Sequence, residues 1–159
     1  MEKLEKIMSP SQRLLVSALA AAALLPVLPG RAAEKPDPKM ISITLPDQIN
    51  WRKSENADVA IIQGDPNKAG IYIQLIKWHP GHMSRPHYHP EERYIWVISG
   101  TWWVGAGPKY DPDSTYPVPA GSMVTDHSGQ IHYDGAKEGD CLLYIVGMGP
   151  SKTIPAEQK

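Results

Sequence analysis

Short apolar runs interrupted by proline and glycine are the feature that most constrains the fold of this chain. Its 159 residues include 16 prolines and 13 glycines, and no amphipathic stretch of useful helical length follows residue 32. Strands that alternate with frequent turns are typical of all-β domains. The length suits one domain with a hydrophobic core but is short for two. We therefore expect a single all-β domain, a closed barrel or a sandwich of about eight strands.

The first 32 residues have the layout of a secretory signal peptide. Basic residues precede an apolar run over residues 14–29, and small residues flank a plausible cleavage site after Ala32. A retained N-terminal membrane anchor is the alternative, but the run contains two prolines and is short for a span of about 20 residues. We expect an exported protein, periplasmic or secreted, that leaves the membrane after cleavage.

The charge of the chain after residue 32 argues against a nucleic-acid-binding protein. Cleavage would leave 12 basic and 15 acidic residues, a net charge of −3, which offers no basic footprint for nucleic acid.

Residues 33–39 are a polar linker, and residues 40–45 alternate loosely as an edge strand is expected to do. The pair Ser99-Gly100 is a tight hairpin signal between two apolar runs. Residues 151–159 show no periodicity and are expected to form a tail.

Three histidines have the spacing of metal ligands. His87 and His89 are two residues apart, so an extended backbone places both imidazoles on one face. His132 follows a glycine-containing turn at the start of another expected strand. Strands that are not adjacent in an antiparallel barrel can bring it against the first pair. A H-x-H pair with a distant third histidine is a ligand arrangement. Imidazole suits Fe, Zn, Ni or Cu, and Mn is kept as a further candidate ion.

Two stretches resemble the two motifs of the cupin superfamily, G-x5-H-x-H-x3-4-E-x6-G and G-x5-P-x-G-x2-H-x3-N. The matching residues are Gly81, His87, His89 and Gly100 in the first stretch, and Gly121, Gly129 and His132 in the second. The resemblance covers about residues 58–148. It implies a single cupin double-stranded β-helix, or jelly-roll barrel, within residues 40–150. It also implies one divalent metal ion held by the three histidines, a small-molecule ligand or substrate, and a homodimer.

The chain departs from this pattern where the motif has its glutamate ligand. Seven positions before Gly100 stands Arg93, whose protonated guanidinium has no lone pair for a cation. Three metal sites remain open at this point: three histidines with free coordination positions, a site completed by Glu91, or a site with His127 as fourth ligand. Arg93 could clamp a substrate anion that also reaches the metal, or form an ordinary ion pair with a neighbouring glutamate.

These residues lead to two expected functions. The first is a periplasmic, metal-dependent small-molecule enzyme of the oxygenase or lyase type, acting on an anionic organic substrate. The second is a non-catalytic cupin module that binds or senses a metal or small ligand. The sequence marks no general base or nucleophile, since Cys141 lies in an apolar run and is read as a small buried hydrophobe. Fold and motif leave the reaction, the substrate and the metal open.

Overall fold

The computed structural model describes residues 33–158, so the predicted signal peptide lies outside the described residues. The chain divides into two units, Met1–Ile43 and Thr44–Lys159. The described part of the first unit, residues 33–43, contains a turn and no regular helix or strand. None of the helices in residues 33–158 is long and apolar enough to cross a membrane.

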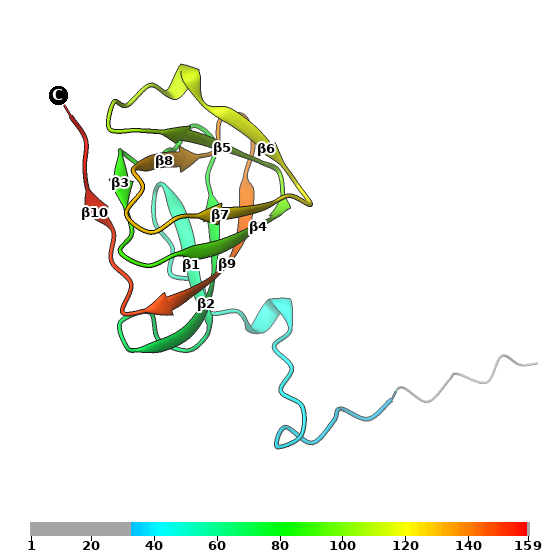
Figure 1. The fold of residues 1–159 in the computed structure, drawn as a ribbon. Helices are drawn as coiled ribbons and strands as arrows, with labels where there is room; N and C mark the ends of the chain where they lie inside the picture. The colour runs from blue at the N-terminus through cyan, green and yellow to red at the C-terminus, as the bar shows by residue number, and fades with distance from the viewer. Residues whose placement is uncertain (1–32, 159) are drawn as a thin grey trace, which may run out of the picture. The chain divides into compact units, whose positions relative to one another are not determined.

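The second unit consists of two antiparallel five-stranded sheets (Figure 1). The first sheet has the order β1-β2-β9-β4-β7 and the second has the order β10-β3-β8-β5-β6. The strands are β1 (Ala57–Gln63), β2 (Gly70–Trp78), β3 (His87–Tyr88), β4 (Arg93–Ser99), β5 (Thr101–Ala106), β6 (Tyr116–Pro119), β7 (Met123–Asp126), β8 (His132–Gly135), β9 (Cys141–Gly149) and β10 (Ile154–Pro155). Two short 3₁₀ helices, η1 (Pro46–Gln48) and η2 (Pro112–Ser114), lie in the connections.

A single core lies between the two sheets. Burial alternates along β4 and β9, because successive side chains of a strand point to opposite faces. The inward residues of these strands pack in one cluster with Trp102 of β5. Cys141 belongs to this cluster, and burial raises the pKa of its thiol to about 12. The cysteine is therefore a small core hydrophobe, as predicted.

The expected hairpin at Ser99-Gly100 is wrong. Strands β4 and β5 follow one another in the chain, yet β4 pairs with β7 and β9, while β5 pairs with β6 and β8. Gly100 has a φ of 76°, and a Cβ added there would lie 2.1 Å from the carbonyl oxygen of Asp140. Only glycine tolerates both the backbone angle and this approach. The short turn therefore carries the chain from one sheet to the other.

The two ends of the domain also differ from expectation. Residues 40–45 form no strand, and their apolar side chains are exposed, so no buried face exists to hold a strand. At the other end, the aperiodic segment 151–159 contains β10, which pairs with β3 (Figure 1). Pro155 of β10 lies opposite His87. The C-terminal segment is thus part of the second sheet and lies beside the histidines.

Candidate metal centre and its cavity

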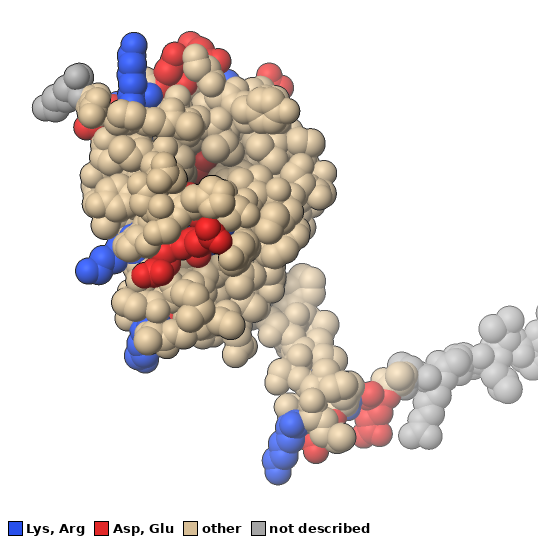
Figure 2. All heavy atoms as spheres, in the orientation of Figure 1, with Lys and Arg blue, Asp and Glu red and all other residues tan. Residues whose placement is uncertain are grey.

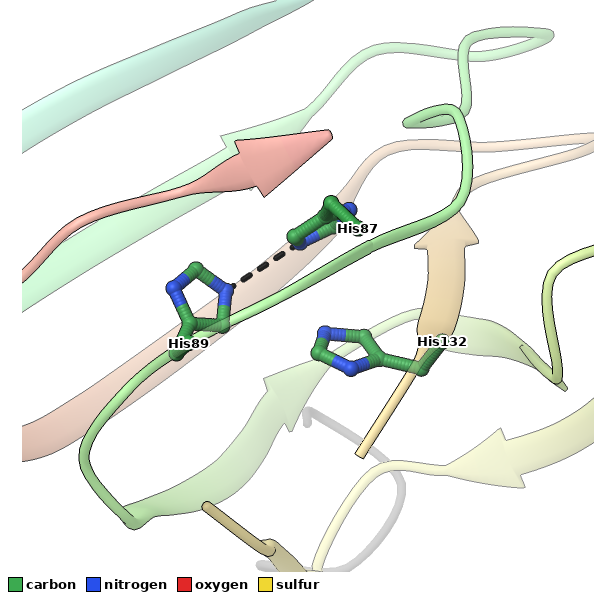
Figure 3. A group of neighbouring side chains, drawn as sticks. All are labelled: His87, His89 and His132. Carbon is green, nitrogen blue, oxygen red and sulfur yellow. Dashed lines mark hydrogen bonds between the residues drawn. The ribbon is translucent and has the colours of Figure 1, made fainter. Parts of the chain in front are cut away.

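Strand β3 and its continuation meet β8 at the three predicted ligand histidines (Figure 3). His87 and His132 lie opposite one another in the β3–β8 pairing, and His89 follows two residues after His87. All three side chains are buried. One nitrogen from each ring lies within 4.8 Å of the other two, and the Nε2 atoms of His87 and His89 are 3.1 Å apart. Residues distant in the sequence thus share one small volume.

Backbone carbonyl groups fix which nitrogen of each ring carries the proton. His87 Nδ1 lies 2.8 Å from the carbonyl oxygen of Arg85, and His89 Nδ1 lies 2.7 Å from that of Lys152. His132 Nδ1 lies 3.1 Å from the carbonyl oxygen of Gln130. A carbonyl oxygen only accepts, so each Nδ1 donates and each Nε2 keeps its lone pair. Such bonds orient ligand histidines in metal sites.

The electrostatics of the three rings fit a bound cation. Burial is the main cause that lowers the pKa of His87 and of His89, the latter to about 3, and the charge of Arg93 lowers the pKa of His89 further. With both rings neutral, the contact drawn as a dashed line in Figure 3 joins two lone pairs without a proton between them. His132 Nε2 is buried without a hydrogen-bond partner among the described residues. Three inward lone pairs repel one another unless a cation lies between them, so this donor set suits a divalent metal ion.

Arg93 forms a buried ion pair with Asp126. The two residues are opposite partners in the β4–β7 pairing. Arg93 Nε and Nη2 donate to Asp126 Oδ2 over 2.9 and 2.6 Å. The other carboxylate oxygen of Asp126 lies 3.1 Å from His132 Nδ1. Asp126 therefore links the arginine to a ligand histidine and neutralises most of its charge.

The sequence did not predict Asp126 as the partner of Arg93; the only ion-pair partners that it suggested for Arg93 were the neighbouring glutamates. The signal that could have found the pair is the position of Asp126, immediately before His127 in the second motif, together with the β4–β7 register. Register depends on pairing between distant segments. Motif spacing alone therefore did not reveal the partner.

The structure does not bring the other two ligand candidates to the histidine group. Glu91 is exposed in the turn before β4, and Pro90 precedes it there. His127 is exposed, and its Nδ1 lies 2.9 Å from Glu92 Oε2. The Tyr94 hydroxyl and His127 both lower the pKa of Glu92 through hydrogen bonds. Among residues 33–158, the ligand group consists of the three histidines.

A cavity of about 340 Å³ lies beside two of the histidines, His87 and His89. Its walls are largely apolar, and the residues that form them are Ile76, Trp78, Ile95, Trp102, Leu143 and Ile145. Arg93 and Asp134 also line it. A second hollow of about 320 Å³ shares His89 and Arg93 and extends to Arg52 and Asn67.

Two strand tryptophans, Trp96 and Trp103, are not among the residues that line this cavity. Trp103 faces the opposite side of β5 from Trp102, with the Lys137 amine 4.1 Å from its ring centre. Trp96 is partly exposed and packs edge-on against Tyr144. Acidic and basic side chains are interspersed over the face of the described residues drawn in Figure 2. Of the four strand tryptophans, Trp78 and Trp102 thus line the cavity, whereas Trp96 and Trp103 do not.

Comparison with known proteins identifies the fold. No family model and no curated protein matches the sequence. Among solved structures, the polyketide cyclase RemF from Streptomyces resistomycificus superposes with a TM-score of 0.63 at 16% identity, covering 76% of this chain and 88% of RemF. A protein with a double-stranded β-helix domain from Klebsiella pneumoniae gives a TM-score of 0.55 at 19% identity, with 73% and 97% covered.

The third similar structure carries the name of the superfamily that the motifs resemble. An RmlC-like cupin protein from Ralstonia eutropha gives a TM-score of 0.52 at 18% identity, covering 68% of each chain. At such identities the similarity establishes the fold alone. The prediction of a cupin double-stranded β-helix is therefore confirmed.

Proposed function

We propose that this protein is an exported, metal-dependent cupin enzyme that acts on an anionic organic substrate, by oxygenase or lyase chemistry. The observation that carries the proposal is the convergence of three inward Nε2 lone pairs, each set by a backbone carbonyl group, beside an apolar cavity. Three protein ligands leave coordination positions free for substrate. A bound divalent ion would supply a Lewis acid there, or a site that activates water or dioxygen.

The charge of the site favours an anionic substrate. Three neutral imidazoles leave the double charge of a metal ion uncompensated, and the apolar walls provide little solvation. An anion that enters from water neutralises this charge in a medium of low dielectric constant, where the attraction is strong. The ligand set and the cavity walls together support this substrate class.

Arg93 is the residue that we assign to holding the anion. Its Nε and Nη2 atoms donate to Asp126, and its Nη1 atom has no hydrogen-bond partner among the described residues. The side chain lines the cavity beside His89. Asp126 fixes the plane of the guanidinium, so the remaining N–H groups are oriented before the substrate arrives. The role of Arg93 is to orient the substrate.

Metal content tests the proposal. The full chain is produced with export, and the bound metal is measured by elemental analysis in the wild type, in His132→Ala and in His127→Ala. We expect one equivalent in the wild type and in His127→Ala, whose imidazole is exposed and outside the group, and a loss in His132→Ala. Equal metal in both variants contradicts the site.

Turnover then separates the enzyme from a binding module. Oxygen uptake and product formation are measured with the metal-loaded protein across a panel of carboxylic acids, diketones and thiols. Consumption of an acid that is lost in His132→Ala supports the enzyme. A loaded protein that binds acids without turning any of them over would instead support the binding and sensing function.

A further inference from the structure

Asp134 is a buried carboxylate that the proposed function does not use. It lies on β8 two residues after His132, so both side chains point to the same face of the sheet. Its exposed fraction is 7%, and it lines the cavity that His87 and Arg93 also line. A strand rises about 3.3 Å per residue. The Cα atoms of His132 and Asp134 therefore lie roughly 7 Å apart along the strand.

The partners of Asp134 are all neutral. Ser84 Oγ donates to Oδ1 over 2.9 Å, and Trp102 Nε1 donates to Oδ2 over 2.8 Å. The carboxylate forms no ion pair with any residue in the described range 33–158. Asp126 and Asp58, the other two buried acids, each have a basic partner, Arg93 and Lys53.

This arrangement leaves hydrogen-bonding capacity unused inside the cavity. An ionised carboxylate has about four acceptor positions, and two neutral donors fill only two of them. A buried charge without a counter-charge is costly unless further donors reach it. A donor group on a bound molecule can supply what the chain does not.

We propose that Asp134 recognises a hydrogen-bond donor on the substrate. This inference rests on the proposed function, because it needs an anionic group held at the histidines and Arg93. The substrate is then an organic acid with a hydroxyl or amino group on the far side of an apolar body. Ile95, Leu143 and Ile145 line the cavity and would contact that body. Asp134 acts as a specificity-determining residue.

Matched benzoates test the inference on the unmodified protein. The full-length exported protein is loaded with Zn²⁺, and the affinities of benzoate, 3- and 4-hydroxybenzoate and 4-fluorobenzoate are measured by calorimetry. The fluorine resembles the hydroxyl in size but donates no proton. We expect at least one hydroxybenzoate to bind about tenfold or more tightly than benzoate and 4-fluorobenzoate, the range for a hydrogen bond to a charged group.

Two variants assign this preference to the residue. In Asp134→Asn we expect benzoate to bind at least as tightly as in the wild type, because a carboxylate that repels the anion is gone. We expect the hydroxyl preference to shrink several-fold, because the acceptor loses its charge. Glu91→Gln, the same change at an exposed site, should keep the full preference. The ligand comparison in the wild type stands even if Asp134→Asn proves unstable.

The possible failures are distinguishable. Equal affinities for benzoate and both hydroxybenzoates overturn the inference, and so does an unchanged preference in Asp134→Asn. In both cases benzoate still binds to the zinc form, and the proposed function stands. Failure of zinc or of all four acids to bind overturns the proposed function itself.

Discussion

The Arg93–Asp126 pair gives a sharp prediction for stability. Their side chains are only 9% and 7% exposed, so solvent screens the pair little. Asp126→Ala removes the counter-charge and leaves a guanidinium buried. Removal of one partner from a buried pair costs about 3–5 kcal/mol. We expect the free energy of unfolding to fall by that amount, although the substitution itself removes only a small side chain.

The double variant separates this penalty from the loss of packing. In Arg93→Met with Asp126→Ala neither charge remains, so most of the lost stability should return. The residual loss should be about 1 kcal/mol, the typical cost of a single substitution once no buried charge is left unpaired. Since the two residues touch, the coupling energy should be about 2 kcal/mol or more.

Urea unfolding in the presence of a chelator provides the assay. It measures the urea concentration at the midpoint of unfolding and the slope of the unfolding free energy against urea concentration. If a variant shifts the midpoint and leaves the slope unchanged, its free energy of unfolding has changed. Lys68→Ala is the control, because it breaks the exposed Lys68–Asp65 pair and should cost under about 1 kcal/mol. Additive losses in the double variant would refute the reasoning, since they would mean that the two charges do not compensate one another.

Three further predictions follow from individual side chains. The pKa of His89 is lowered from 6.5 to about 3 in the fold, so between these pH values the unfolded state binds a proton that the folded state does not. The metal-free protein should therefore lose stability as pH falls from 6.5 to about 3. His89→Gln should flatten this pH dependence of the free energy of unfolding, measured by urea titration. Cys141 should react with a thiol reagent only after unfolding, because burial raises its pKa to about 12; fast labelling of the native protein would contradict this. Trp102→Phe removes the donor to Asp134 and should lower the free energy of unfolding by about 1–3 kcal/mol, measured by urea unfolding.

The sequence predicted those parts of the structure that depend on local pattern. Alternating apolar residues indicated the strands, and the spacing of His87 and His89 placed both rings on one side. The fold class and the meeting of these rings with His132 follow from this pattern and from the motif resemblance. The signal at Ser99-Gly100 was misread because a short glycine turn joins paired strands and sheet-crossing strands equally well. The approach of Gly100 to Asp140, a contact between connections, decided the outcome.

The remaining parts of the site depend on contacts between distant segments. The partner of Arg93 is set by the β4–β7 register, and the tautomer of His89 by the carbonyl group of Lys152. A backbone carbonyl carries no side-chain signal, so the segment 151–159 looked like an unstructured tail. Nothing in the sequence around Asp134 indicates that Ser84 and Trp102 enclose it.

The exchange of a carboxylate for an arginine changes what this site can hold. A glutamate ligand would cancel one of the two charges of a metal ion, whereas Arg93 at that position brings a positive charge that Asp126 already neutralises. The full double charge of the ion would then remain beside the cavity that the carboxylate of Asp134 also lines. In the proposed mode of binding, these two charges would orient a molecule that is anionic on one side and a hydrogen-bond donor on the other. A metal ion with a purely structural role would need neither free coordination positions nor a buried carboxylate such as Asp134 in the adjoining cavity.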